Sequence, residues 1–418
     1  MFKKISSCRI CNSKNLSKYL DLGETPLANS LIKPENKNQK ELFFPLETLY
    51  CSDCSLSQLS IVVDPKTMFS DYVYRSSVSE TFRKHCSELA VELKKRFEKN
   101  DLKALDIASN DGCLLMEFKK HGFSVIGVEP AKNIAVIAEK NKIHTITEFW
   151  GEKTAEKVLK EFNGKADVIT ATNVLAHVDK VSDFVSAMHS VLDENGLIVI
   201  EVPSAEKLIE ENEFDTIYHE HLSYFLLKPL IELFERNSFK AVDVEQIGIH
   251  GGTIRFFAAK NSSKRKPNTK ALTGFLEKEN ASGLYELKTY LRLAENTKKI
   301  KSDLTSLLKK LKSENKSVAA YGASAKGSTL LNYCNIGTDF IDFIVDDTPE
   351  KQNKLTPGNH ISVFPRTRLE KEKPDFLLLL SWNFAREFIK KTPEHRLRGG
   401  KYILPIPAVK IISSEDEL

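Results

Sequence analysis

Short apolar strands alternate with amphipathic helices through the middle of the chain, and this alternation constrains the fold more than any other feature. Apolar runs lie at 104–107, 124–128, 166–172 and 196–202, with helical spacing between them. Strands that alternate with helices in this way predict a parallel sheet with helices on both faces. Such a sheet binds ligands at the carboxyl ends of its strands. Residues 71–260 are therefore expected to form a doubly wound α/β domain with a crevice at that edge.

The loops after the first two strands carry the side chains expected in this crevice. Glu129 ends the second strand, where a carboxylate can accept hydrogen bonds from both ribose hydroxyls of an adenosine. The loop Ala108–Gly112 has one glycine where a dinucleotide fingerprint has three, which disfavours NAD and favours S-adenosylmethionine. A plain strand–helix turn is the alternative. The predicted cofactor-binding residues are Asp106, Ala108, Ser109, Asn110, Gly112, Glu129, Pro130 and Asn173.

Four of the seven cysteines form two C-x2-C pairs near the start of the chain. Two residues between thiolates let one knuckle present both sulfurs to one ion, and two knuckles complete the tetrahedral shell that Zn²⁺ prefers. Because four sulfurs leave no position for water, the zinc is predicted to be structural; two disulfides or loose thiols are the alternatives. Residues 1–70 are the predicted zinc-binding domain, with the ligands Cys8, Cys11, Cys51 and Cys54. The other three, Cys86, Cys113 and Cys334, are interpreted as small buried apolar groups.

The segment 213–225, EFDTIYHEHLSYF, concentrates groups suited to acid–base chemistry. Histidine can act as a base near neutral pH, tyrosine can donate to a developing oxyanion, and a carboxylate can orient an imidazole. The spacing is not H-E-x-x-H, so no zinc-protease site is predicted. His177 follows the strand at 166–172 and is expected to face the same crevice. His250, in the turn HGGT, is either a substrate contact or part of a simple hairpin turn.

A second nucleotide-fold-like unit is predicted at the end of the chain. Residues 261–418 begin with a basic, prolyl linker and continue with a long amphipathic helix, whose leucines are expected to pack on a neighbouring domain. A dimer contact is the alternative for that helix. The loop 322–327, GASAKG, lies between a strand and a helix. It is expected to hold a substrate diphosphate with the charge of Lys326, and an ordinary turn is the alternative.

Charge and hydropathy exclude several classes of partner. The 61 basic and 57 acidic residues give a formal net charge of +4, which is too balanced for a nucleic-acid-binding protein. No apolar run reaches the roughly 18 residues of a membrane-spanning helix, and the start lacks the apolar core of a signal peptide. We therefore expect a cytoplasmic protein with reduced thiols and no membrane partner. A monomer is expected, with a dimer as the alternative.

The order of these motifs is that of a known family. After the four cysteines come LDIASNDGCLL, VIGVEPA, NVLAHVDKVSDF, IVIEVPS, FDTIYHEHLSYF, HGGTIRFF and YGASAKGSTLLNY. Nearly the whole chain resembles the three-domain sugar C-methyltransferases of deoxysugar pathways, which methylate C3 of nucleotide-linked 4-keto sugars with S-adenosylmethionine. Ala108 stands where that family usually has glycine, in LDIGSNDG. Alanine is accommodated at this position if its φ angle is negative.

The resemblance implies roles for the matching residues. His221 would be the base that removes the hydrogen α to the ketone, with Tyr218 and Glu220 as its active-site partners and His177 as a further group beside it. Tyr72 matches a family tyrosine that reaches the same pocket. A base and an oxyanion donor are also what C-methylation of a ketone requires on chemical grounds. The alternatives are an NAD-dependent sugar oxidoreductase that uses the GASAKG loop, a non-catalytic zinc scaffold, and methyl transfer to a different acceptor such as a capsule or lipopolysaccharide precursor.

Overall fold

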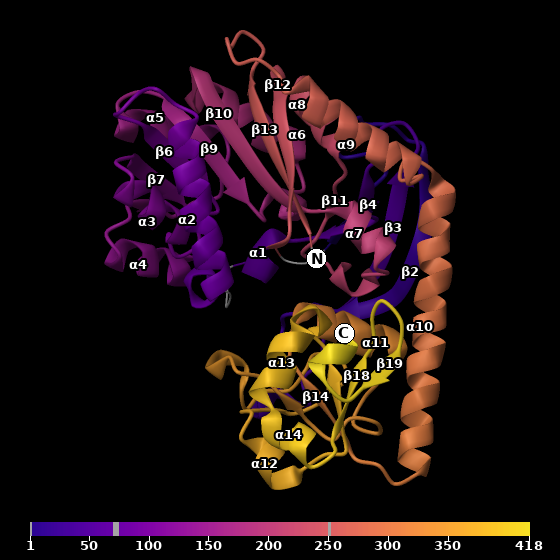
Figure 1. Ribbon diagram of the computed structural model, residues 1–418. Helices are drawn as coiled ribbons and strands as arrows, with labels where there is room; N and C mark the ends of the chain where they lie inside the picture. The colour runs from indigo at the N-terminus through magenta and orange to yellow at the C-terminus, as the bar shows by residue number, and fades with distance from the viewer. Residues whose placement is uncertain (1, 70–74, 250–251) are drawn as a thin grey trace.

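The computed structural model describes residues 2–69, 75–249 and 252–418 (Figure 1). Tyr72 and His250, two of the predicted site residues, lie outside these ranges. The described part of the chain folds as the predicted α/β protein, with three sheets of four to seven strands and one two-stranded pair. Within the same ranges, no helix combines the length and the apolar character that crossing a membrane requires.

A seven-stranded sheet forms the middle part of the molecule, in the order β12-β13-β10-β9-β6-β7-β8. Its strands are β6 (Lys103–Ile107), β7 (Ser124–Val128), β8 (Thr145–Ile146), β9 (Ala166–Thr172), β10 (Leu192–Pro203), β12 (Phe239–Ile247) and β13 (Thr253–Lys260). The pairs among β6 to β10 are parallel, and β13 is antiparallel to β10 and β12. The parallel strands β6, β7 and β9 are buried along most of their length because helices cover both faces of the sheet, whereas the edge strand β12 alternates polar and apolar residues. The predicted doubly wound domain is confirmed, with an antiparallel edge in addition.

The helices that cover this sheet begin where the sequence changes from strand to helical spacing. They are α2 (Glu80–Lys95), α3 (Cys113–Lys120), α4 (Lys132–Lys140), α5 (Glu152–Phe162), α6 (Val181–Val191) and α8 (Leu227–Glu235). Each carries an apolar stripe; in α2, for example, Phe82, Cys86, Leu89, Ala90 and Leu93 are buried. Residues spaced three and four apart lie on one face of a helix, so this stripe faces the sheet.

The N-terminal part forms a four-stranded antiparallel sheet in the order β11-β4-β3-β2. Its strands are β2 (Leu16–Pro26), β3 (Phe43–Cys51), β4 (Ser57–Leu59) and β11 (Ser223–Tyr224), and β1 (Phe2–Lys4) pairs separately with β5 (Ile61–Val63), which α1 (Pro65–Phe69) follows. The edge strand β11 comes from the segment 213–225, so this segment is attached to the N-terminal sheet.

The C-terminal part is a six-stranded sheet in the order β16-β15-β14-β17-β18-β19, parallel except for β19. Its strands are β14 (Val318–Tyr321), β15 (Ile344–Val345), β16 (Val363–Phe364), β17 (Phe376–Leu379), β18 (Lys401–Leu404) and β19 (Lys410–Ile412). Its helices are α11 (Ala325–Cys334), α12 (Arg368–Glu372), α13 (Ala385–Lys391) and α14 (Pro393–Leu397). Helices α7 (Ala205–Glu210) and α9 (Thr269–Ala281) lie in the middle part, and α10 (Leu287–Ser313) follows α9 along the chain.

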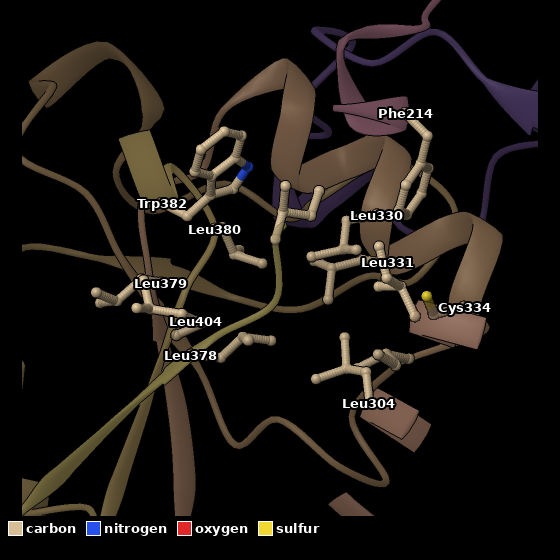
Figure 2. Packing of buried hydrophobic residues seen from close by; sticks show 14 of the residues in the cluster. Phe214, Leu304, Leu330, Leu331, Cys334, Leu378, Leu379, Leu380, Trp382 and Leu404 are labelled. Atoms are coloured by element: carbon tan, nitrogen blue, oxygen red, sulfur yellow. The ribbon is translucent and has the colours of Figure 1, made fainter. Parts of the chain in front are cut away.

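Helix α10 runs along the side of the molecule from the middle part to the C-terminal part (Figure 1). At 27 residues it is about 40 Å long. Near its start, the ring of Tyr290 lies 4.6 Å from that of Tyr50 and 5.1 Å from that of Tyr19. Further along, Leu304 is buried in the C-terminal core beside Leu331 (Figure 2). The expectation that its leucines pack on neighbouring parts of the chain is thus met for most of them, although Leu291 remains 44% exposed.

Candidate active site

A cavity of about 570 Å³ lies where the carboxyl ends of the middle strands face the C-terminal part. Most of its lining comes from three groups of residues: the loops after β6, β7, β9 and β10, the segment 213–224, and the turns at 324–326 and 381–384. Of the predicted cofactor residues, those that line it are Asp106, Ala108, Ser109, Asn110, Glu129, Pro130 and Asn173. Gly112 is not in this lining; its amide donates to the Ser109 carbonyl at 3.0 Å.

Glu129 is held in a fixed orientation at the end of β7. Its Oε2 accepts a hydrogen bond from the Asn110 amide at 3.0 Å, and its Oε1 accepts one from the Ala131 amide at 2.8 Å. A carboxylate oxygen has two lone pairs, so each oxygen can accept one further bond. Burial raises the pKa of Glu129 above its usual value. The two oxygens are thus arranged to accept the pair of vicinal hydroxyls that the ribose of an adenosine presents.

The loop after β6 adopts left-handed backbone conformations at three of its positions. The φ angles are 59° at Ala108, 51° at Asn110 and 80° at Gly112. The expectation of a negative φ at Ala108 is therefore wrong: the chain must turn sharply between β6 and α3, and alanine pays about 1–2 kcal/mol for this conformation. Gly127 of β7 also packs closely against this loop. A Cβ added at Gly127 would lie 2.5 Å from Ser109 Oγ, which leaves no room for a side chain there.

Two polar atoms in the cavity wall fit a bound cofactor. Ser109 Oγ and Asn173 Oδ1 are buried and have no hydrogen-bond partner among the described residues. Buried polar atoms are nearly always paired in folded proteins, so these two indicate a ligand or water in the crevice. Asp106 is different: it accepts a hydrogen bond from Thr170 Oγ1 at 2.6 Å, and burial raises its pKa to about 7. Asp106 thus supports the strand end from beneath.

His221 and Tyr218 form a directly bonded pair in the cavity wall. The Nδ1–H of His221 donates to the Thr216 carbonyl at 2.8 Å, which leaves a lone pair on Nε2. That lone pair accepts a hydrogen bond from the Tyr218 hydroxyl at 2.9 Å. Burial, together with the nearby His177, lowers the pKa of His221 to about 3. The imidazole is therefore neutral at physiological pH, with a basic nitrogen directed at its neighbour in the cavity.

His177 completes a cluster of three rings. Its ring centroid lies 4.9 Å from that of His221, and burial lowers its pKa to about 4. The backbone beside it is hydrogen-bonded to the segment 213–225, because the Leu222 amide donates to the Ala176 carbonyl at 2.7 Å. The structure thus brings together His177, Tyr218 and His221, three residues from two separate segments.

Glu220 lies elsewhere, contrary to its expected place beside His221. Its carboxylate accepts a hydrogen bond from Asn29 Nδ2 at 2.6 Å and is not in the cavity lining. Burial raises the pKa of Glu220 to about 7. The group that orients His221 is the Thr216 carbonyl. The reason is the backbone turn at 218–221, which directs successive side chains to different sides, so that His219 also points away and contacts Pro45.

Lys326 lines the cavity from the first turn of α11, whose N-cap is Ser324. Its ammonium lies 3.5 Å from the Glu213 carboxylate and 4.9 Å from the centre of the Trp382 ring. Glu213 and Trp382 were not identified from the sequence. Glu213 belongs to the acidic start of the segment 213–225, which was a usable signal. Trp382 is far from that segment in the chain, and no local pattern could have connected the two.

The four paired cysteines gather at one point, as predicted. Their Sγ atoms all lie within 4.8 Å of one another, and Cys8–Cys54 and Cys11–Cys51 are separated by 3.4 Å and 3.6 Å. A tetrahedral Zn²⁺ with bonds of about 2.3 Å requires sulfurs about 3.8 Å apart, so the cluster fits the ion. The hydrogen bond from Cys54 lowers the pKa of Cys8 to about 5, and the same interaction raises the pKa of Cys54.

Three domain families match the chain in succession. They are described as "Putative zinc binding domain" over residues 8–69, "Methyltransferase domain" over 78–244 and "C-methyltransferase C-terminal domain" over 248–407. The C-methyltransferase NovU of Streptomyces niveus is 33% identical over 417 residues, which cover 100% of this chain and 99% of that protein. The ubiquinone biosynthesis O-methyltransferase of Colwellia psychrerythraea is 25% identical over 167 residues, 37% of this chain and 66% of that one.

Among solved structures, the chain is similar to the magnesium protoporphyrin IX methyltransferase of Synechocystis with bound S-adenosylmethionine, at 13% identity and a TM-score of 0.33 over 43% of this chain and 79% of that one. An S-adenosylmethionine-dependent methyltransferase of Clostridium acetobutylicum gives 14% identity and a TM-score of 0.34 over 43% of this chain and 92% of that one. From the family matches and the four-cysteine cluster, the cofactors of this chain are S-adenosylmethionine and zinc.

Proposed function

The chain belongs to the C-methyltransferase family that includes NovU, and on this premise we propose that it methylates the carbon next to the ketone of a nucleotide-linked 4-keto sugar, with His221 as the base. The observation that supports this most is the bonded pair of Tyr218 and neutral His221 in the wall of the cofactor cavity. S-adenosylmethionine supplies an electrophilic methyl group in such a reaction. The chain itself must supply a nucleophilic carbon, and that requires removal of a proton.

The geometry at His221 suits proton removal from carbon. A hydrogen α to a ketone is acidic because the resulting anion is an enolate, and Nε2 of His221 carries the lone pair that accepts from Tyr218 until the substrate enters. When Nε2 takes the proton, the Thr216 carbonyl at Nδ1 remains in place to stabilise the imidazolium. The Tyr218 hydroxyl, released from Nε2 by the incoming substrate, can donate to the enolate oxygen. The low pKa of His221 makes this donation necessary, because a weak base removes a proton only if the anion is stabilised.

The far side of the cavity is suited to the nucleotide part of the substrate. Ser324, Lys326 and Asn383 of the C-terminal part line it, and Lys326 supplies a positive charge. A diphosphate at this place would put the linked sugar toward Tyr218 and His221, which line the same cavity. The oxidoreductase and scaffold alternatives are set aside, since the chain belongs to a methyltransferase family and its cavity contains a base and a donor.

Hydrogen exchange tests the base separately from methyl transfer. With S-adenosylhomocysteine in D₂O, the enzyme should exchange the hydrogen α to the ketone of a 4-keto nucleotide sugar for deuterium, measured by mass spectrometry. His221→Asn should lose both exchange and methylation. Tyr218→Phe should slow both by about 10²–10³, the usual cost of one oxyanion donor.

Binding of S-adenosylhomocysteine, measured by calorimetry, is the control for an intact fold in both variants. If His221→Asn binds it normally and still exchanges at the normal rate, His221 is not the base and His177 becomes the candidate. If the enzyme methylates none of the 4-keto nucleotide sugars tested but methylates another acceptor, the substrate class is wrong.

A further inference from the structure

Glu213 and Lys326 form an ion pair in the cavity wall that is both buried and loosely made. Glu213 is 5% exposed, and the side chain of Lys326 is 19% exposed. The distance of 3.5 Å between Lys326 Nζ and Glu213 Oε2 is long for a charge-assisted hydrogen bond, which is usually about 2.7–2.9 Å. Glu213 Oε1 has no hydrogen-bond partner among the described residues. The lysine is therefore held near the acid without being tightly bound to it.

A second buried acid makes the cluster short of positive charge. Asp215 is fully buried, and its Oδ2 accepts a hydrogen bond from the Trp382 indole at 2.8 Å. Its Oδ1, like Glu213 Oε1, is unpaired within the described ranges. Lys326 lies over the same Trp382 ring. Two buried carboxyl groups thus share one ammonium, and such an arrangement favours retention of a proton on one of the acids.

Glu213 lines the cavity and Asp215 does not, so Glu213 is the acid that a bound ligand can influence directly. Burial is the main cause that raises the pKa of Glu213 to about 7; Lys326 partly offsets it, and Asp215 and Glu211 add to it. These are the charged groups that face it from its own segment, from the end of α7 and from α11. Burial also raises the pKa of Asp215. Lys207 of α7 is occupied by Glu210 at 2.8 Å and Glu211 at 3.6 Å. Lys326 is thus the cation whose removal would leave Glu213 without a partner.

We propose that Glu213 and Lys326 form a proton-linked anion site, in which a phosphate of the substrate takes Lys326 and Glu213 takes up a proton from solvent. The phosphate as ligand rests on the proposed function, since a nucleotide-linked sugar carries a diphosphate. The phosphate removes the one positive charge that stabilises the Glu213 carboxylate and adds negative charge beside it. No covalent bond changes, and the proton remains on Glu213 until the phosphate leaves. Before the phosphate binds, the Glu213 carboxylate holds Lys326 at the cavity. After the phosphate binds, protonation removes the negative charge of Glu213.

Calorimetry in two buffers of different ionisation enthalpy measures the proton directly. The probes are thymidine diphosphate, uridine diphosphate and inorganic pyrophosphate, added to the zinc-loaded full-length protein at pH 8. At this pH the two nucleoside diphosphates have lost their own protons, so any proton taken up on their binding goes to the protein. About half a proton or more per bound nucleoside diphosphate is expected, because Glu213 is mostly ionised before binding. Pyrophosphate still holds one proton at pH 8 and is compared by affinity; a similar Kd would show that the phosphates alone suffice.

Variants separate the two roles. Glu213→Gln should bind the probes but lose the proton uptake and the dependence of Kd on pH between 6 and 9. Lys326→Met should weaken binding by about 10- to 100-fold, with partial recovery in Lys326→Arg. Glu210→Gln is the matched control, since this acid pairs with Lys207 at 2.8 Å and its side chain is 40% exposed, and it should keep the uptake.

The proposal is overturned if the wild-type protein binds with no proton uptake, if Glu213→Gln retains it, or if no probe binds at millimolar concentration. A methylation assay with 4-keto nucleotide sugars separates this result from the fate of the proposed function. Methylation without proton uptake would contradict the proton-linked anion site but not the proposed function. Proton uptake with thymidine diphosphate, but no methylation of any nucleotide sugar, would contradict the proposed substrate class and support the proton-linked anion site.

Discussion

Ala108 occupies a left-handed backbone position in the loop between β6 and α3. Its φ angle of 59° lies in the region that glycine enters freely and alanine enters at a cost. The neighbouring left-handed positions are Asn110 and Gly112, both residue types that tolerate this conformation. Ala108 is thus the strained position of the loop that carries the predicted cofactor residues.

Ala108→Gly should therefore stabilise the protein, by about 0.5–1 kcal/mol, because relief of the strain exceeds the entropy that glycine adds to the unfolded chain. Urea denaturation measures the change. Ala271→Gly in helix α9 is the matched control, and it should destabilise by about 1 kcal/mol, since that alanine has helical geometry. A loss of stability in both variants would contradict the strain at Ala108.

Glu220 is the second residue whose environment differs from its expected place, and its buried carboxyl makes stability depend on pH. The folded-state pKa of about 7 is above the usual value of 4.5. Between these values the folded state binds more protons than the unfolded state, so the contribution of Glu220 to stability is present at low pH and is lost as the pH rises toward 7.

Position 220 does not titrate in Glu220→Gln. The free energy of unfolding of this variant, relative to that of the wild type, should therefore rise by about 2 kcal/mol from pH 5 to pH 8. Thermal or urea unfolding at both pH values measures this, with Glu156→Gln at an exposed site of α5 as the baseline. Because Glu220 is outside the cavity lining, methyl transfer should stay within about tenfold of wild type. An equal stability difference at both pH values would show that the carboxyl is not desolvated.

At the scale of elements, the zinc knuckle is connected to the loop that carries His177. Arg9 lies between two of the zinc ligands, and its guanidinium donates to the Leu59 carbonyl at 3.1 Å. Its Nε lies 3.8 Å from Asp179 at the end of that loop, and Lys3 contacts the other oxygen of Asp179 at 2.6 Å. The loop between β9 and α6 is thus supported from the N-terminal part.

Removal of zinc should therefore loosen this loop as well as the knuckle. We expect about one zinc per chain in the purified protein, and its release by a chelator or in Cys51→Ser. Hydrogen exchange should then become faster at 174–179, while it stays unchanged in α11, which lies in the C-terminal part. Unchanged exchange at 174–179 after the metal has left would show that the knuckle does not position His177.

At the scale of the whole molecule, the N-terminal part joins two cores. The ligands Cys8, Cys51 and Cys54 pack in the core of the seven-stranded sheet. Leu46 and Tyr50 of the same part pack instead with α10 and the C-terminal sheet. The cavity lies between these two cores, so its shape depends on their relative position, which α10 and the N-terminal sheet maintain together.

Leu304→Ala in α10 should destabilise the molecule by about 2–5 kcal/mol, because Leu304 is fully buried in the C-terminal core (Figure 2). The urea midpoint measured by far-ultraviolet circular dichroism and the midpoint measured by zinc release to a chromogenic chelator should both shift to lower urea concentration together. Leu291→Ala is the control on the same helix; its side chain is 44% exposed, and its effect should stay within about 0.5 kcal/mol. Zinc release at an unchanged urea concentration would show that the two ends unfold independently.

Local patterns in the sequence determined the strand at 166–172, the four zinc ligands and the segment that contains Tyr218 and His221. The reason is that each depends on a short period or a fixed spacing. Hydrophobic runs mark strands, and two residues between cysteines define a knuckle. Position after a strand was also enough to bring His177 to the same crevice, because parallel strands end at one edge of the sheet.

Only the tertiary structure decided the direction of Glu220, the positive φ of Ala108 and the contacts of Glu213 with Lys326. In each case the deciding contact is distant in the chain or absent from any periodic pattern. Glu220 turns to Asn29 across the N-terminal sheet, and Lys326 meets Glu213 only because α11 packs beside the segment 213–225. Sequence periodicity tells which face of an element is buried, whereas the partner of a buried charge is set by how the elements pack, since a desolvated charge is stable only where packing brings it a counterpart.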